Sequence, residues 1–321
     1  MAAAQLHTQI LGTGGYLPRE VRTNADLERM VDTTDEWIVE RTGIRERRIA
    51  AADETAVFMG TQAAQAALTA AGTQAADIDG VICATTSADY AFPSVACSIA
   101  RGLGISRVAA FDVAAACAGF NYAYALAHAL IVSGGASRVL VVGVDLLSHA
   151  CRHDDRTTLI LFGDGAGAVV LGASSEPGTL ATLMSSEPQC GDALTLRIPS
   201  RHHHDEAYLY MKGNEVFRHA VVILAELVTQ TLARAGLSAG ELDFLVPHQA
   251  NLRIIRATAR RLQLDMSRVI ITLDRQGNTS AASVPLALDE GIRSGRIRRG
   301  HTVLLESFGG GLTWGSALIR Y

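Results

Sequence analysis

Short runs of consecutive apolar residues alternate with longer segments of helical spacing along most of this chain. Gly80–Ala84 and Arg138–Val144 are apolar without alternation, which is typical of strands that are buried on both faces. Residues 54–71 form an alanine-rich amphipathic segment, which predicts a helix that ends at Gly72. The hydrophobic pattern therefore indicates an α/β protein whose sheet is covered by helices on both sides.

The sequence also contains an internal repeat. Ala67–Ala84 matches Thr231–His248 at an offset of 164 residues, the difference between positions 67 and 231. The apolar run Val139–Val142 matches Val303–Glu306 at the same offset. Equal offsets favour two copies of one βα-rich half over a chance match. We therefore expect two halves, an N-terminal one over residues 1–172 and a C-terminal one over residues 173–321.

Three stretches have a less regular pattern. Thr8–Leu11 predicts a short strand that ends in a glycine-rich turn, and Asn24–Val31 predicts a short helix that Asn24 caps. Gly172–His204 contains three prolines and is expected to be irregular. Its tract His202–His204 could bind a metal, but neighbouring side chains project in different directions, so we expect no metal site there.

Composition narrows the class of protein. Of the 321 residues, 49% are hydrophobic and 19% are charged, as in a globular protein with a large core. The net charge of −4 gives no electrostatic reason to expect a nucleic-acid partner. Asp112, Asn121 and His128 interrupt the longest apolar stretch, and the N-terminus lacks a basic region followed by an apolar run. We therefore expect neither a membrane helix nor a targeting segment.

The cysteines point to a reducing compartment. The chain has five of them at wide, irregular spacings, and no C-x-x-C pair occurs. An odd number without regular spacing argues against a disulfide framework, and the missing pair argues against a structural zinc site. We therefore expect free thiols and a cytoplasmic location.

Cys117 stands where one predicted element changes into another. Val108–Val113 has the pattern of a strand, and buried helical spacing follows through Phe120, Tyr124 and Ile131. A helix N-terminus favours negative charge, so a cysteine at this junction is helped to ionise to a nucleophilic thiolate. Free cysteine is also among the most buried residue types, and the local sequence leaves a packing role open.

Three further turns follow predicted strands and carry chemically capable groups. His248 comes directly after the strand Phe244–Val246 and Pro247. Asn278 lies in a loop before a helix that Thr279 or Ser280 could cap. Gly309–Gly311 follow another strand, and their backbone N–H groups can approach a substrate oxygen closely.

Five motifs together resemble a known family, 3-oxoacyl-[acyl-carrier-protein] synthase III, over nearly the whole chain. They are D-V-A-A-A-C-A-G-F, F-G-D-G-A-G-A, V-P-H-Q-A-N-L-R-I, G-N-T-S-A-A-S-V-P and F-G-G-G-L-T-W-G. The resemblance implies a thiolase-like fold, in which two pseudo-repeated βα halves form a layered α-β-α-β-α sandwich. Within it, F-G-D-G-A-G-A is interpreted as a tight turn between strands and not as a nucleotide-binding loop.

The resemblance also implies roles for individual residues. Cys117 would be the acylated nucleophile, with His248 and Asn278 completing the triad, and the amides of Cys117 and Gly310 would form the oxyanion hole. Phe92 would lie near an acyl pocket, that of a partner subunit. The residues implied to bind coenzyme A are Trp37, Arg41 and Arg156, and those implied to contact the carrier protein are Arg218, Arg253, Arg256 and Arg260.

The implied reaction is a decarboxylating Claisen condensation. An acyl-CoA primer would acylate the cysteine, and malonyl on the acyl carrier protein would then lose CO2 and attack the acyl group, initiating fatty-acid synthesis by a ping-pong mechanism. The thioesters are substrates, so no cofactor and no metal is expected. The resemblance further implies a cytoplasmic homodimer that binds neither nucleic acid nor membrane.

Three alternatives compete with this interpretation. A related Cys-His-Asn enzyme of secondary metabolism, of the polyketide or alkylquinolone type, would use the same residues on the same scaffold. A catalytically idle scaffold would be expected to have a damaged triad, and all three positions are intact. A degradative thiolase needs a second cysteine near the C-terminal glycines, and none lies beyond Cys190.

Overall fold

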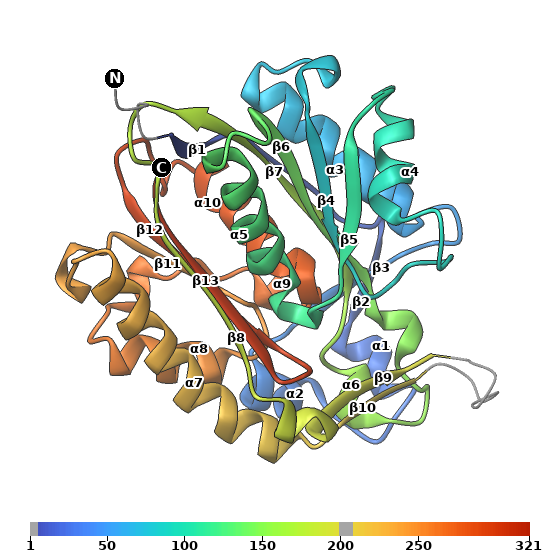
Figure 1. Ribbon diagram of the computed structural model, residues 1–321. Helices are drawn as coiled ribbons and strands as arrows, with labels where there is room; N and C mark the ends of the chain where they lie inside the picture. Colours follow the sequence, from blue (N-terminus) through green and yellow to red (C-terminus); the bar gives the residue numbers. More distant parts are fainter. Residues whose placement is uncertain (1–5, 199–207) are drawn as a thin grey trace.

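The computed structural model describes residues 6–198 and 208–321. Its first half is built on a five-stranded sheet of order β1-β7-β6-β4-β5 (Figure 1). β1 and β6 pair antiparallel with β7, whereas β4 is parallel to both β6 and β5. The strands are β1 (His7–Tyr16), β4 (Gly80–Ala84), β5 (Ala109–Val113), β6 (Arg138–Leu146) and β7 (Asp164–Ser174).

The second half repeats this arrangement in a four-stranded sheet of order β11-β12-β13-β8. β8 and β12 pair antiparallel with β13, β11 is parallel to β12, and a parallel bridge joins Leu245 to Val269. The same succession of antiparallel and parallel pairs accounts for the internal repeat in the sequence. The strands are β8 (Thr179–Ser186), β11 (Phe244–Pro247), β12 (Thr302–Gly309) and β13 (Thr313–Arg320).

Helices form three layers around the two sheets (Figure 1). One core cluster joins α5 and α10 to strands of both sheets, so these helices form the central layer. α3 and α4 cover the outer face of the first sheet, and α7 and α8 cover that of the second. The predicted α-β-α-β-α sandwich is confirmed. The helices are α3 (Ala56–Ala71), α4 (Val95–Gly102), α5 (Gly119–Val132), α7 (Gly213–Arg234), α8 (Leu252–Arg261) and α10 (Ser283–Arg293).

Smaller elements surround one end of the sandwich. β2 pairs antiparallel with β3, and β9 pairs antiparallel with β10. Among the short helices, α1 and α2 lie between β2 and β3, α6 lies between β6 and β7, and α9 precedes α10. Their bounds are β2 (Glu20–Thr23), α1 (Asn24–Glu28), α2 (Asp35–Thr42), β3 (Glu46–Ile49), α6 (Arg156–Leu159), β9 (Leu194–Arg197), β10 (Tyr208–Met211) and α9 (Leu273–Gln276).

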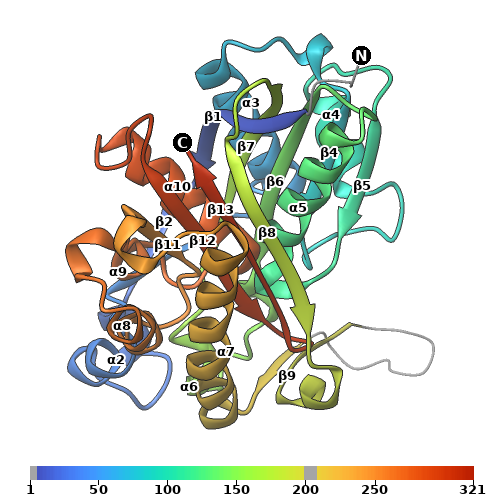
Figure 2. The ribbon, with the colours of Figure 1, turned by 60° about the vertical axis from the view of Figure 1, so that its left-hand side comes forward.

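α7 is long and apolar enough to cross a membrane by length and composition, which the sequence pattern did not predict. In the structure it lies beside α8 on the outer face of the second sheet (Figure 2). Its buried residues face that sheet, so packing accounts for much of its apolar character. They are Ala220, Leu224, Ala225, Leu227, Val228, Thr231 and Leu232.

Two predictions near the N-terminus are wrong. β1 continues through the glycines that were expected to form a turn, because α3 packs directly on them. A Cβ at Gly12 would lie 2.3 Å from the backbone nitrogen of Ala71. The N-cap of α1 is Thr23 and not Asn24, since the buried amide of Asn24 donates instead to the carbonyl of Ile44.

The central segment is more regular than predicted. Residues 179–186 form β8, an outer strand of the second sheet, and residues 194–197 form β9. F-G-D-G-A-G-A is not a simple turn either, because β7 begins within it at Asp164. β7 runs to Ser174, two residues past the boundary expected between the halves. The tract Arg201–His204 lies outside the described residues.

Candidate active site

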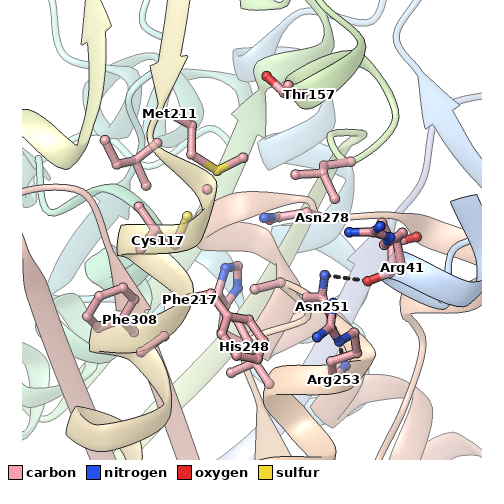
Figure 3. A pocket seen from close by; sticks show the side chains of 18 of the residues that line it. Arg41, Cys117, Thr157, Met211, Phe217, His248, Asn251, Arg253, Asn278 and Phe308 are labelled. Carbon is pink, nitrogen blue, oxygen red and sulfur yellow. Dashed lines mark hydrogen bonds between the residues drawn. The ribbon is translucent and has the colours of Figure 1, made fainter. Parts of the chain in front are cut away.

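The three residues expected to carry the chemistry line one cavity of about 280 Å³ (Figure 3). Cys117 comes from the loop after β5 in the first half, and His248 follows β11 in the second half. Asn278 comes from the loop between α9 and α10. The site therefore forms only where the two halves meet.

Cys117 lies in a tight 3₁₀ turn, residues 116–118, directly before α5. It is 5% exposed, and burial raises the pKa of its thiol to about 12. Desolvation of the charged form therefore opposes the ionisation that the helix N-terminus favours. The thiol proton must therefore be removed during the reaction.

The glycines at the end of β12 lie against the nucleophile. A Cβ at Gly309 would lie 2.6 Å from the backbone nitrogen of Cys117, so only glycine allows this approach. Gly310 and Cys117 together line a second, smaller cavity of about 50 Å³. Phe162, Leu147 and other apolar residues also line it.

His248 is buried and neutral. Burial lowers its pKa to about 3, because the charged imidazolium would lose its hydration. Its Nδ1 lies 2.6 Å from the hydroxyl oxygen of Ser283, which also accepts the backbone N–H of Gln249 at 3.4 Å. In the tautomer in which the Ser283 hydroxyl donates to Nδ1, the ring proton lies on Nε2.

Asn278 is held by backbone and side-chain contacts. Its N–H donates to the carbonyl of Leu161, and its carbonyl accepts the N–H of Gly163. Its side-chain oxygen accepts the backbone N–H of Ser280 at 2.9 Å. The side-chain nitrogen is therefore the amide atom that points toward the sulfur of Cys117 (Figure 3).

The expected cap of the following helix is wrong. α10 begins at Ser283 with Ala282 at its N-cap and no side-chain cap. Ser280 instead adopts a φ of +51° and donates its hydroxyl to the sulfur of Cys117 at 3.4 Å. Local pattern could not reveal this contact, because it joins residues 163 positions apart.

Of the three residues expected to bind coenzyme A, Trp37 and Arg41 line the large cavity, and Arg156 lies against Trp37. The ring of Trp37 has the guanidinium carbons of Arg156 and Arg41 at 4.7 and 5.4 Å from its centroid. Asn251, which the sequence analysis missed, donates its amide to the carbonyl of Arg41 (Figure 3). Two cations beside an aromatic ring suit a ligand that has both a flat base and phosphates.

The other predicted residues lie around the site and not at its centre. Phe92 is 86% exposed and lines neither of these two cavities in the described chain. Arg253 lines the mouth of the large cavity, and its guanidinium lies 5.2 Å from the ring of Phe217. Arg256, Arg260 and Arg218 are exposed on α8 and α7.

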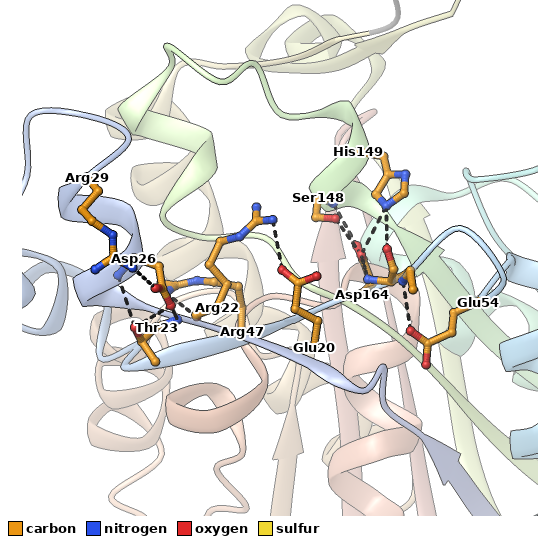
Figure 4. A network of polar contacts seen from close by, with 12 residues as sticks. Glu20, Arg22, Thr23, Asp26, Arg29, Arg47, Glu54, Ser148, His149 and Asp164 are labelled. Carbon is orange, nitrogen blue, oxygen red and sulfur yellow. Dashed lines mark hydrogen bonds and ion pairs between the residues drawn. The ribbon is translucent and has the colours of Figure 1, made fainter.

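A network of polar contacts joins β2, α1 and β3, and Arg47 is part of it (Figure 4). Arg47 is fully buried, and it donates to the carbonyls of Arg22 and Ile160 and to the side chain of Asn24. Ile160 precedes the loop that pairs with Asn278. Arg47 therefore ties the N-terminal elements of the site to the loop that positions Asn278.

The described residues contain no group of three or more His, Cys, Asp or Glu side chains that could hold a metal ion. Because the tract Arg201–His204 is outside them, this finding does not test that part of the sequence.

Comparison with known proteins gives concordant matches. Two family models match: 3-oxoacyl-[acyl-carrier-protein (ACP)] synthase III over residues 111–188, and the C-terminal model of the same name over residues 232–321. Beta-ketoacyl-[acyl-carrier-protein] synthase III of Sodalis glossinidius (strain morsitans) is 60% identical over 319 residues, which are 98% of this chain and all of that protein. The Serratia proteamaculans (strain 568) protein of the same name is 58% identical over 98% of this chain and all of its own.

Solved structures show the same relationship. 3-oxoacyl-[acyl-carrier-protein] synthase III from Aquifex aeolicus VF5 superposes with a TM-score of 0.93 at 46% identity, covering 98% of this chain and all of that one. The priming beta-ketosynthase from the R1128 polyketide biosynthetic pathway has a TM-score of 0.94 at 38% identity, covering 99% and 98%.

Proposed function

This chain belongs to the 3-oxoacyl-[acyl-carrier-protein] synthase III family and is an acyltransferase of that type, and we infer its reaction from this premise. It condenses an acyl-CoA primer with malonyl on the acyl carrier protein, releases CoA and CO2, and so initiates fatty-acid synthesis. The observation that carries the mechanism is the meeting of Cys117, His248 and Asn278 in one cavity.

In the first half-reaction, the sulfur of Cys117 attacks the thioester carbonyl of the primer, and CoA leaves. We propose that Trp37 stacks the adenine of CoA while Arg41 and Arg156 pair with its phosphates. The cavity that leads inward from them has mainly apolar walls, among them Phe308, which suits the pantetheine arm.

In the second half-reaction, malonyl loses CO2 and becomes an enolate with a developing negative charge on oxygen. Nε2–H of neutral His248 and the side-chain amide of Asn278 both donate toward the cavity, and such donors stabilise that charge. The enolate carbon attacks the acyl group on Cys117, with the amides of Cys117 and Gly310 proposed as the oxyanion hole. This chemistry uses the two thioesters as substrates and draws on no cofactor.

The smaller cavity sets the primer that we propose. It holds about 50 Å³ beside the sulfur of Cys117. It is much smaller than the neighbouring cavity of about 280 Å³, so it suits a short acyl chain better than a long or branched one. We therefore propose acetyl-CoA as the preferred primer.

A primer series tests both the function and this preference. With malonyl carrier protein present, we expect turnover of acetyl-CoA to exceed that of isobutyryl-CoA and octanoyl-CoA by about tenfold or more, since a branched or long chain overfills the small cavity. The measurement is mass spectrometry of the 3-oxoacyl carrier product. Best turnover with octanoyl-CoA would overturn the primer assignment.

The same assay separates the proposed function from its relative in secondary metabolism. Malonyl-CoA replaces the malonyl carrier in a parallel reaction, and condensation with malonyl-CoA alone would favour the polyketide or alkylquinolone type. The priming beta-ketosynthase of the R1128 polyketide pathway is a solved relative that supports this alternative. It is 38% identical to this chain, whereas the Sodalis protein is 60% identical.

We also propose that the enzyme is a cytoplasmic homodimer. β5 is an outer strand of the first sheet, and the apolar side chains of Phe111, Tyr90 and Phe92 are exposed on and beside it. An apolar strand edge of this kind is typically covered by another chain. In a dimer formed there, Phe92 would reach the partner's acyl pocket, and sedimentation as a 33.9 kDa monomer would contradict this.

All five cysteines are free, which fits a reducing compartment.

The carrier protein is proposed to dock on α8. Arg253, Arg256 and Arg260 are exposed on one face of this helix, opposite its buried residues, and Arg218 lies on the neighbouring α7. An acidic partner would be steered to such a face by charge complementarity.

A crossed experiment separates the two binding sites. Trp37→Ala is expected to raise KM for acetyl-CoA about tenfold, because stacking on the ring is lost. Arg256→Glu is expected to raise KM for the malonyl carrier by a similar factor, because the charge that attracts an acidic partner is reversed. Steady-state kinetics with each substrate varied in turn is the measurement. Each variant is the control for the other, and an Arg256→Glu enzyme with an unchanged KM for the carrier would exclude Arg256 from the docking face.

A further inference from the structure

The side chain of Asp145 is a buried carboxylate to which the mechanism above gives no role. It is fully buried near the end of β6. β6 runs beside β4, and their pairing ends at Ala84 and Gly143, so Asp145 lies just beyond the paired region (Figure 1). A buried carboxylate needs hydrogen-bond donors, and the segments that supply them are held in place by it.

One carboxylate oxygen holds the loop that follows β4. Oδ1 of Asp145 accepts the backbone N–H of Thr86 at 2.7 Å and the hydroxyl of Thr86 at 3.0 Å. It also accepts the hydroxyl of Ser87 at 3.1 Å, and the oxygen of that hydroxyl accepts the N–H of Leu146 at 2.9 Å. These bonds fix the start of the loop relative to β6.

The other oxygen holds a turn from the second half of the chain. Oδ2 accepts the backbone N–H of Ala281 at 3.2 Å. Ala281 lies in the 3₁₀ turn 280–282 that leads into α10, a helix without a side-chain cap at its own N-cap residue. The first N–H groups of a helix lack partners within it, so a carboxylate is well placed there. β6 also packs closely on this turn, since a Cβ at Gly143 would lie 2.3 Å from the carbonyl oxygen of Ala281.

Both of these segments are walls of the small cavity beside Cys117. Thr86 lines that cavity, and so does Ser280, the residue before Ala281. Asp145 itself lines neither of the two cavities in the described chain, so it can act on a substrate only through these walls. The position of the walls decides which acyl chain the cavity accepts, because a packed pocket selects among small chains by shape.

We propose that Asp145 is a positioning residue that fixes the width of the small cavity and so excludes primers larger than acetyl, and this rests on the proposed function. Its two oxygens fasten walls from different halves of the chain to one strand. An amide could not do the same, because its NH2 group would face a donor. With the amide oxygen kept toward Thr86, the NH2 would face the N–H of Ala281, and the turn 280–282 would lose its bond to β6.

Competition between two primers tests the proposal. Each protein is incubated briefly with equal amounts of acetyl-CoA and isobutyryl-CoA, and intact-protein mass gives the ratio of the two acyl-enzymes. Wild type should favour acetyl about tenfold or more, and Asp145→Asn is expected to lower that ratio about tenfold. Ser87→Ala removes one donor to Asp145 at a residue that does not line the cavity, and is expected to lower the ratio about threefold.

The ratio separates positioning from a general loss of structure. A variant that only contains less folded protein slows acylation by both primers equally and keeps the wild-type ratio. Asp289→Asn is the matched control, because Asp289 is another buried carboxylate that accepts a hydroxyl, that of Thr13 at 2.7 Å. It lies on α10 and lines neither of the two cavities, so its variant should keep the wild-type ratio.

Three results would overturn the proposal. They are a wild-type ratio in Asp145→Asn, an equal change of the ratio in Asp289→Asn, and a wild type that shows no preference for acetyl. If Asp145→Asn does not fold, Ser87→Ala decides, and a wild-type ratio in that variant would overturn the proposal. Failure of the proposed function is distinct, since wild type would then take up no acyl group from either CoA.

Discussion

Replacing Cys117 with alanine is expected to abolish the acyl-enzyme and to lower turnover of acetyl-CoA with the malonyl carrier by about 10⁴-fold or more. The sulfur lies where the large cavity meets the small one, so it is placed to receive an acyl group from CoA and to hold its chain. Intact-protein mass after incubation with acetyl-CoA is the measurement. Wild type should gain one acetyl group, and Cys117→Ala none.

Cys97 provides the matched control for this result. It is the exposed cysteine of the chain, on α4, so reagents reach it without entering the site. Cys97→Ala should still acquire one acetyl group, and the malonyl carrier should discharge it. An acetyl adduct that survives in Cys117→Ala, or disappears in Cys97→Ala, would show that Cys117 is not the nucleophile.

Substitution of His248 or Asn278 is expected to separate the two half-reactions. His248→Ala removes the Nε2–H donor. Asn278→Asp replaces the side-chain NH2 donor with an oxygen, and its other carboxylate oxygen can still accept the N–H of Ser280. Each should still form the acyl-enzyme, because the lost donor is assigned to the enolate of the second half-reaction. Each should lower CO2 release from the malonyl carrier by about 10²- to 10³-fold, the effect of one lost donor to a developing oxyanion.

The pH dependence of CO2 release adds a second check. Burial lowers the pKa of His248 to about 3, so the neutral ring is the dominant form above that pH. The rate of CO2 release should therefore not change through titration of His248 between pH 5 and 8, the range in which a solvent-exposed histidine titrates. A step near 6.5 that His248→Ala removes would show that the ring is charged in the working enzyme, contrary to the donor role assigned here.

Local pattern was sufficient for much of the fold. Continuous apolar runs predicted β4 with its observed bounds, and the alanine-rich segment predicted the end of α3 at Gly72, which adopts a φ of +59°. These elements follow from side-chain periodicity and glycine chemistry, which depend on neighbours within a few residues. The same reasoning failed at Gly12. The sequence pattern there fits both a turn and a strand, and only the close packing of α3 distinguishes them.

The motifs around Cys117, His248 and Asn278 were also visible in the sequence, because each follows a strand and carries a distinctive set of residues. Their position around one cavity was implied only by the resemblance to the family, and the paired sheets bring it about. The protonation states differ from what local pattern suggested. Burial by both halves raises the pKa of the Cys117 thiol, against the ionisation expected from the N-terminus of α5.

The sequence by itself thus determined which elements form, that the chain consists of two similar halves, and which residue types carry the chemistry. Only the tertiary structure decided that the hydroxyl of Ser280 points at sulfur, that Ser283 holds the ring of His248, and that burial suppresses the charge of both catalytic groups. The physical reason is distance along the chain. Periodicity reports contacts within a few residues, whereas the hydrogen-bond partners of Cys117 and His248 lie 163 and 35 positions away along the chain.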